Sequence, residues 1–136
     1  VDVLICGGIG VGAQNALKEA GIRSFVATSK PQVHAEAICQ KFGIAPYVEA
    51  IAGPAVGGTD TKADVMRRIL AGLGPVEKGD AVMVGDRRFD IIGAHELGLP
   101  VIYVTYGYGD EAERKAFQPD YTAATVGDLK QLLLQA

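Results

Sequence analysis

The sequence has no long hydrophobic run. No stretch is long enough to span a bilayer, and the amino-terminal residues do not form a signal peptide. We therefore expect a cytoplasmic protein without a membrane partner.

Clusters of positive charge are also absent. The chain has 13 lysine and arginine residues against 16 aspartate and glutamate residues, which gives a formal net charge of -3. Because there is no basic run, we do not expect nucleic acid or an anionic membrane surface as a partner. Small anions remain possible ligands.

Cysteine and histidine are scarce, with two residues of each type. Cys6 falls in a predicted strand and Cys39 in a predicted helix, which favours buried thiols over a disulfide and indicates a reducing compartment. His34 and His95 have no second histidine or cysteine at ligand spacing, so we do not expect either to bind a metal.

Apolar residues are plentiful, at 49% of a chain of 136 residues. This length and composition predict one compact domain over residues 1–136. Short apolar runs alternate with amphipathic segments, which is typical of βαβ units. The sequence therefore predicts a three-layer, Rossmann-like α/β fold with helices on both faces of a parallel sheet.

The pattern predicts a five-stranded parallel sheet with strand order 3-2-1-4-5. The strands are expected at 1–6, 23–27, 47–52, 81–84 and 101–105. Helices are expected at 13–20, 31–42, 87–98 and 126–134, with a further helix ending near Leu73 and a short extended piece at Tyr121. Thr61 and Asp64 have the spacing of a capping box at the start of that further helix.

The most informative segment is 82–90, Val-Met-Val-Gly-Asp-Arg-Arg-Phe-Asp. An apolar strand that ends at Gly85 would deliver Asp86 to the carboxyl edge of the sheet, where open α/β sheets bind their ligands. Asp90 would follow about one helical turn later and face the same point, so the two carboxylates suit Mg²⁺. The alternative is a helix-capping Asp86 followed by a surface Asp90.

Several segments together resemble the haloacid dehalogenase (HAD) superfamily of phosphatases, and phosphoglycolate phosphatases in particular. The resemblance covers about residues 25–136. Segment 26–31, Val-Ala-Thr-Ser-Lys-Pro, is similar to the second family motif, Lys62 to the third and segment 85–90 to the fourth. Segment 94–100, Ala-His-Glu-Leu-Gly-Leu-Pro, is also typical of this group.

The resemblance implies roles for five residues. Thr28 and Ser29 would bind a phosphoryl group, Lys62 would neutralise its charge, and Asp86 and Asp90 would hold Mg²⁺. A hydroxyl at a strand end beside a helix amino terminus suits an anion, and a lysine adds the positive charge that phosphoryl transfer needs. The alternatives are that Thr28 and Ser29 only cap a helix and that Lys62 is a solvated side chain.

The family keeps its nucleophile and general acid in an Asp-x-Asp at the end of the first strand, and this sequence has none. Gly7 takes the position of the nucleophile and Ile9 that of the acid. Neither can attack phosphorus or transfer a proton, so we expect no hydrolysis by the phosphoaspartyl route. The family's cap segment is also missing at this point, and only weak Mg²⁺ binding is expected.

Residues 1–24 resemble a different family, that of dinitrogenase iron-molybdenum cofactor biosynthesis proteins, through the segment Val-Asp-Val-Leu-Ile-Cys-Gly-Gly-Ile-Gly-Val-Gly-Ala-Gln-Asn-Ala. This suggests a chimeric or designed protein, with a natural, cap-less pseudophosphatase as the alternative. The glycine-rich loop also fits a dinucleotide pattern loosely, although no acid follows the second strand. Gly8 would contribute to a nest of N–H groups that faces Thr28 and Lys62.

Taken together, these patterns favour a catalytically impaired HAD phosphatase-like scaffold that keeps a seat for phosphate and Mg²⁺. The first alternative is an active hydrolase of small phosphomonoesters, similar to phosphoglycolate phosphatase. The second is binding of a nucleotide or metal cofactor through the glycine-rich loop. The protein is expected to be a monomer or a weak homodimer.

Overall fold

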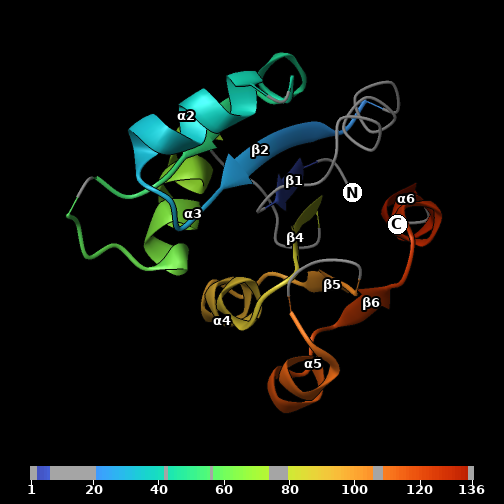
Figure 1. The fold of residues 1–136 in the computed structure, drawn as a ribbon. Coiled ribbons are helices and arrows are strands. Elements are labelled where there is room, and N and C mark those ends of the chain that lie inside the picture. Colours follow the sequence, from blue (N-terminus) through green and yellow to red (C-terminus); the bar gives the residue numbers. More distant parts are fainter. Residues whose placement is uncertain are drawn as a thin grey trace.

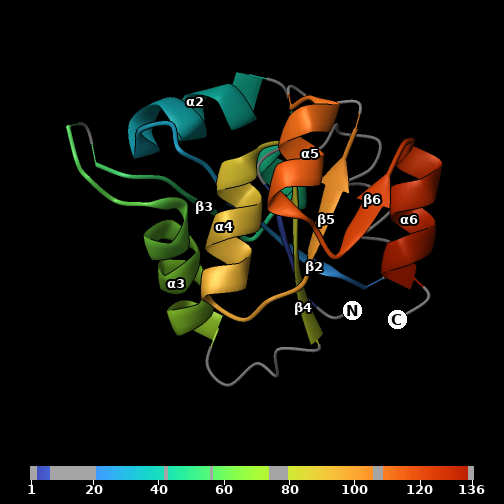
Figure 2. The same ribbon diagram turned by 90° about the horizontal axis from the view of Figure 1, so that it is seen from below.

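A computed structural model of the chain describes residues 3–6, 21–41, 43–55, 57–73, 80–105 and 109–134. Its centre is a sheet of six parallel strands in the order β3-β2-β1-β4-β5-β6, with helices packed around it (Figures 1 and 2). The strands are β1 (Val3–Cys6), β2 (Arg23–Ala27), β3 (Ala50–Ala52), β4 (Ala81–Gly85), β5 (Val101–Val104) and β6 (Tyr121–Ala123).

The two central strands are buried along their whole length, as expected for strands covered on both faces. β1 pairs with β2 on one side and β4 on the other, so that Cys6 lies in register with Val26 and Val84. Connections lead from β1 toward β2 and β3, and from β4 toward β5 and β6. The order therefore reverses between β1 and β4, and ligands of such sheets bind in the crevice outside the carboxyl ends at this reversal.

The described α-helices are α2 (Gln32–Lys41), α3 (Lys62–Leu73), α4 (Arg88–Glu96), α5 (Glu111–Phe117) and α6 (Val126–Leu134), and a 3-10 helix, η1, spans Ala45–Tyr47. Residues of α2 and α6 pack on one face of the sheet with Leu4 and Cys6, and residues of α3 and α4 pack on the other face with Val3 and Ile5. Successive side chains of β1 therefore pack into two separate hydrophobic cores, one on each face of the sheet. The predicted three-layer α/β fold is confirmed.

The predicted strand order 3-2-1-4-5 is confirmed, and the sheet has one strand more than the five predicted. The extended piece expected at Tyr121 is this strand, β6, which pairs with β5. β3 is shorter than predicted because 45–47 form η1, in which Pro46 is at a starting position. The expected helix over 13–20 lies outside the described residues.

Both cysteines are buried and free of disulfides, as expected. Burial raises the pKa of the Cys39 thiol, which lowers its reactivity. In the part of the chain that the structure describes, no helix has the length and apolar character needed to cross a membrane.

Candidate functional site

Thr28 and Ser29 follow directly on β2, at the carboxyl edge of the sheet. The Thr28 amide donates to Ala52 O at 3.0 Å, which extends the pairing with β3 by one residue. Its hydroxyl accepts a hydrogen bond from the Lys30 amide at 3.2 Å. The hydroxyl therefore stabilises the turn after β2 and does not cap α2, which begins later at Gln32.

Lys62 is the first residue of α3, and a capping box holds that end of the helix. The Thr61 hydroxyl accepts from the Asp64 amide at 3.2 Å, and the Asp64 carboxylate accepts from the Thr61 amide at 3.0 Å. The predicted capping box is therefore confirmed. The alternative of a solvated Lys62 side chain is wrong, because only 9% of that side chain is exposed.

The Lys62 ammonium group connects strand β2 to helix α4. Lys62 Nζ donates to Ala27 O of β2 at 3.3 Å and lies 3.0 Å from Asp90 Oδ1 of α4. The Asp90 side chain is 4% exposed, so the ion pair is almost wholly screened from water. Separating the two partners would leave an uncompensated charge buried in the protein, which is strongly destabilising. Each partner therefore fixes the position of the other.

The second oxygen of Asp90 organises the turn between β4 and α4. Asp90 Oδ2 accepts hydrogen bonds from the Asp86 amide at 3.1 Å and the Arg87 amide at 3.2 Å. Oδ1 differs from Oδ2, because it lies in ion-pair distance of Lys62 Nζ but accepts no hydrogen bond from the described residues. The alternative of a surface Asp90 is wrong, and so is the alternative of Asp86 as helix cap, because Arg87 holds that position.

The described residues supply few ligands for Mg²⁺. Among them, no three histidine, cysteine, aspartate or glutamate side chains gather where they could hold a metal ion. Asp86 is half-buried at the carboxyl end of β4. Asp90 Oδ2 accepts from two amides, whereas Oδ1 faces Lys62 Nζ as an ion pair without a hydrogen bond. Two carboxylates are fewer oxygen ligands than Mg²⁺ takes, so the metal site of Asp86 and Asp90 stays a prediction.

Glu113 of α5 contributes a third carboxylate to this turn. Glu113 Oε1 lies 3.2 Å from Arg87 Nε and also accepts from the Arg88 amide at the start of α4. Burial raises the pKa of the neighbouring Tyr103, and the charges of Glu113, Asp86 and Asp110 raise it further.

The sequence pattern did contain a signal for α5, although no helix is predicted there. Asp110 followed by Glu113 has the spacing of a helix cap, and the Asp110 carboxylate accepts from the Glu113 amide at 2.8 Å. Glu113 is consequently the site residue that sequence reasoning missed.

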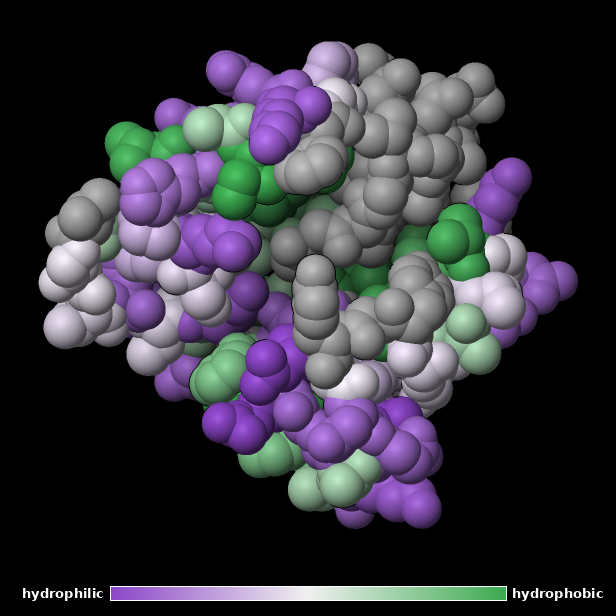
Figure 3. Space-filling model, in the orientation of Figure 1, coloured by the Kyte–Doolittle hydropathy of each residue, from purple (hydrophilic) through white to green (hydrophobic). Residues whose placement is uncertain are grey.

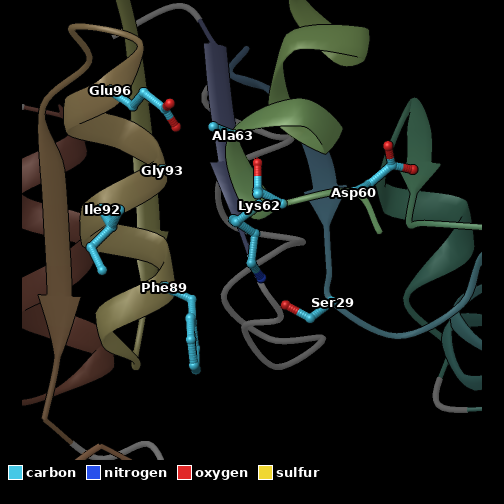
Figure 4. A pocket seen from close by; sticks show the side chains of 9 residues that line it. Ser29, Asp60, Lys62, Ala63, Phe89, Ile92, Gly93 and Glu96 are labelled. Atoms are coloured by element: carbon cyan, nitrogen blue, oxygen red, sulfur yellow. The ribbon is translucent and has the colours of Figure 1, made fainter. Parts of the chain in front are cut away.

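A groove of about 360 Å³ opens beside Lys62, where α3 and α4 lie side by side. Ser29 and Lys62 line its mouth, Phe89 and Ile92 form the α4 wall, and Asp60 and Glu96 also border it (Figure 4). Figure 3 shows hydrophobic residues at the surface over α4, bordered by hydrophilic ones. Gly7, Gly8 and Ile9, which were singled out in the sequence, lie outside the described residues.

Fold and site together define a doubly wound α/β domain with a buried lysine–aspartate pair at the carboxyl edge of its sheet. The chain belongs to the family of HAD-like hydrolases, because the model of that family, described as HAD-hydrolase-like, matches residues 61–129.

Individual relatives agree with this assignment. The chain is 38% identical to a 5'-nucleotidase of Pseudomonas aeruginosa over 119 residues, which are 87% of this chain and 53% of that protein. It is 36% identical to a phosphoglycolate phosphatase of Rhodospirillum rubrum over 97 residues, 71% of this chain and 40% of that protein. The chain thus spans about half the length of these curated relatives or less.

A crystal structure of a predicted phosphatase from Clostridium acetobutylicum has a TM-score of 0.86 and 38% identity, and it covers 92% of this chain and 58% of that one. Residues 25–136 are only about four fifths of the chain, so this match includes part of the first 24 residues. β1 is also paired in register with both neighbours in one sheet. Neither the chimeric origin nor the relationship to the dinitrogenase cofactor family is supported by these findings.

Proposed function

We propose that the chain is the phosphate-binding core of a HAD-like phosphatase and binds the phosphoryl group of a small phosphomonoester. The observation that carries this proposal is the buried Lys62 ammonium group, held 3.0 Å from Asp90 and 3.3 Å from Ala27 O at the carboxyl edge of the sheet. An ammonium group has three N–H donors, so these two contacts leave one for a phosphoryl oxygen.

The turn after β2 supplies the rest of the phosphate-binding site, which consists of Lys62 and Ser29 and is called the phosphate seat below. Ser29 lines the same groove as Lys62, and the Thr28 hydroxyl holds the turn through the Lys30 amide. A phosphoryl group beside Lys62 would receive a charge-assisted hydrogen bond from Nζ and a neutral one from the Ser29 hydroxyl. Because Asp90 fixes Nζ from behind, the lysine need not lose further side-chain freedom when the anion binds.

Among the described residues, a divalent cation would have the carboxylates of Asp86 and Asp90 as its ligands, the latter through Oδ1, while Asp90 Oδ2 holds the Asp86 amide in place. When bound, such an ion would act as a Lewis acid toward a phosphoryl oxygen. Two carboxylates give weak binding, so the proposal does not depend on the metal.

Hydrolysis of small phosphomonoesters is the second candidate function. The names of the relatives, 5'-nucleotidase and phosphoglycolate phosphatase, favour it. Against it, positions 7–10 read Gly-Gly-Ile-Gly after β1, so the end of that strand offers no carboxylate as nucleophile. The two candidates differ in turnover and agree in binding.

The first test is thermal unfolding with and without inorganic phosphate. We expect a higher unfolding midpoint with phosphate, and loss of this shift in the double variant Lys62→Met, Asp90→Asn, which removes both charges of the buried pair. Loss of one charge-assisted hydrogen bond should weaken phosphate binding about tenfold or more. Lys130→Met, at an exposed position of α6, is the matched control and should keep the shift.

Ser29→Ala provides an independent variant because Ser29 is exposed and its loss should not perturb the fold. We expect it to weaken phosphate binding less than the double variant does. An unchanged midpoint of the wild-type protein across millimolar phosphate would contradict the proposal.

Turnover of p-nitrophenyl phosphate separates the two candidates. We expect no turnover by the core alone. Turnover that disappears in Asp86→Asn, while the unfolding midpoint is kept, would establish the hydrolase instead.

A further inference from the structure

The groove between α3 and α4 is continuous with the proposed phosphate seat. Ser29 and Lys62 line both, and α4 supplies the opposite wall (Figure 4). Its volume of about 360 Å³ lies within the ordinary range of small-molecule sites, roughly 300–1,000 Å³. A phosphomonoester held at Lys62 would therefore have room for its leaving group in this groove.

The α4 wall of the groove is apolar and faces solvent. Phe89 is 44% exposed and Ile92 is 47% exposed, and the two residues are one turn apart on α4. Gly93 keeps the junction of the helices tight, because a Cβ atom there would lie 3.2 Å from the Lys62 side chain. Binding a ligand that covers this aromatic ring and this branched aliphatic side chain is favourable, because it removes apolar surface from water.

Charge changes sign along the groove. The charge of Lys62 is balanced by Asp90, but the Arg88 guanidinium carbon lies 4.8 Å from the centre of the Phe89 ring, so positive charge stands beside the groove at its Phe89 end. Toward the other end of α4 stands Glu96, whereas Asp60 is paired with Arg68 at 2.9 Å. A leaving group with its own carboxylate would meet Glu96, and an uncharged one would not.

From this arrangement we infer that the α3–α4 groove receives the leaving group of the phosphomonoester and selects an uncharged, apolar one, with an aromatic ring preferred. The phosphoryl group occupies the mouth at Lys62 and Ser29, and the ring lies against Phe89 and Ile92. This inference rests on the proposed phosphate seat and adds the substrate class to it.

The test compares three phosphonates, whose carbon–phosphorus bond resists hydrolysis, by calorimetric titration. Methylphosphonate probes the phosphate seat alone, phenylphosphonate adds the ring, and 4-carboxyphenylphosphonate adds a negative charge at the far end of the ring. We expect phenylphosphonate to bind about two- to tenfold more tightly than methylphosphonate. The carboxylate should cancel much of this gain.

Two groove variants and two matched controls locate the effect. Phe89→Ala and Ile92→Ala should remove the preference for phenylphosphonate and leave the affinity for methylphosphonate unchanged. Phe117→Ala and Val126→Ala change an exposed phenylalanine and an exposed aliphatic residue elsewhere and should change neither affinity. Glu96→Gln should restore binding of the carboxylated ligand.

The outcomes separate the inference from the proposed function. Equal affinity of methylphosphonate and phenylphosphonate, or a preference that survives in both Phe89→Ala and Ile92→Ala, overturns the inference and leaves the phosphate seat intact. Tightest binding of 4-carboxyphenylphosphonate also overturns it. If neither methylphosphonate nor inorganic phosphate binds, the seat and the inference fail together.

Discussion

Gly85 shows how one missing side chain determines the geometry of the site. A Cβ atom at this position would lie 2.2 Å from Asp90 Oδ2 and 2.3 Å from Asp90 Cβ. The backbone of Gly85 is not in the left-handed region, so the glycine is needed for close packing and not for the sharp turn expected from the sequence. The Asp90 side chain reaches the Asp86 amide and Lys62 because Gly85 leaves this space.

We predict that Gly85→Ala lowers the free energy of unfolding by about 2 kcal/mol or more, because the new methyl group overlaps a buried carboxylate. It should also abolish phosphate binding by displacing Asp90 from Lys62. Urea unfolding and phosphate titration measure the two effects.

Gly72→Ala is the matched control, since a Cβ atom there meets nothing within 4 Å in an exposed part of α3. It should raise the free energy of unfolding by up to about 1 kcal/mol through helix propensity. Equal stability of the two alanine variants would show that Asp90 does not depend on the space at Gly85.

At the scale of elements, the position of Lys62 depends on where α3 begins. The reciprocal hydrogen bonds of Thr61 and Asp64 fix that start at Lys62, directly after Thr61. We predict that Thr61→Ala lowers the free energy of unfolding by about 1 kcal/mol, as for other lost helix caps. Because α3 could then fray at Lys62, phosphate affinity should fall as well.

Thr59→Ala serves for comparison, because Thr59 is an exposed threonine of the preceding loop. Its effect in urea unfolding should stay within about 0.5 kcal/mol. Similar losses in the two variants would mean that the capping box does not hold the start of α3.

The elements that could be predicted from the sequence are those with a local signal. The capping box preceded α3, and α6 has the predicted bounds, Val126–Leu134. The helix α5 was missed although Asp110 caps it, because none of its residues is buried and its sequence has no apolar stripe. β3 is half-exposed at the sheet edge, so its limits depend on η1 and not on hydrophobicity.

The location of the site could be predicted from the sequence, but its hydrogen bonds and ion pairs could not. Spacing along the chain placed Asp86 and Asp90 near the carboxyl edge, and the resemblance added Lys62. Which donors each carboxylate accepts from is a tertiary property, set by the approach of α3 to α4 and by the space at Gly85. The same reason applies to Glu113, which reaches the turn from a separate helix.

For the whole molecule, hydrogen-bonded carboxylates determine the response to acid. Hydrogen bonds from Arg23 lower the pKa of Glu49, and those from the Thr61 amide and hydroxyl lower the pKa of Asp64. Partial burial raises the pKa of Asp120, but hydrogen bonds from His95 and the Val101 amide outweigh it, so that pKa is lowered overall. A lowered pKa in the folded state means stability that is present above the unfolded pKa and lost as pH falls.

We therefore predict that the free energy of unfolding is near its maximum at neutral pH and declines from about pH 4 downward, where carboxylates ordinarily begin to protonate. Urea unfolding across a pH series measures this decline. Glu49→Gln should make the decline shallower, and Arg23→Gln should do the same, because the two residues share one bidentate ion pair. A free energy of unfolding that is constant from pH 7 to pH 3 would contradict the prediction.

The two edges of the sheet have a consequence for self-association. β3 and β6, which close the sheet on either side, have three residues each. Such short edges offer few unpaired N–H and C=O groups on which a strand of another molecule could add. The fold thus keeps its fully buried apolar strands, β1 and β4, away from both edges, and this arrangement protects the folded chain from edge-to-edge aggregation.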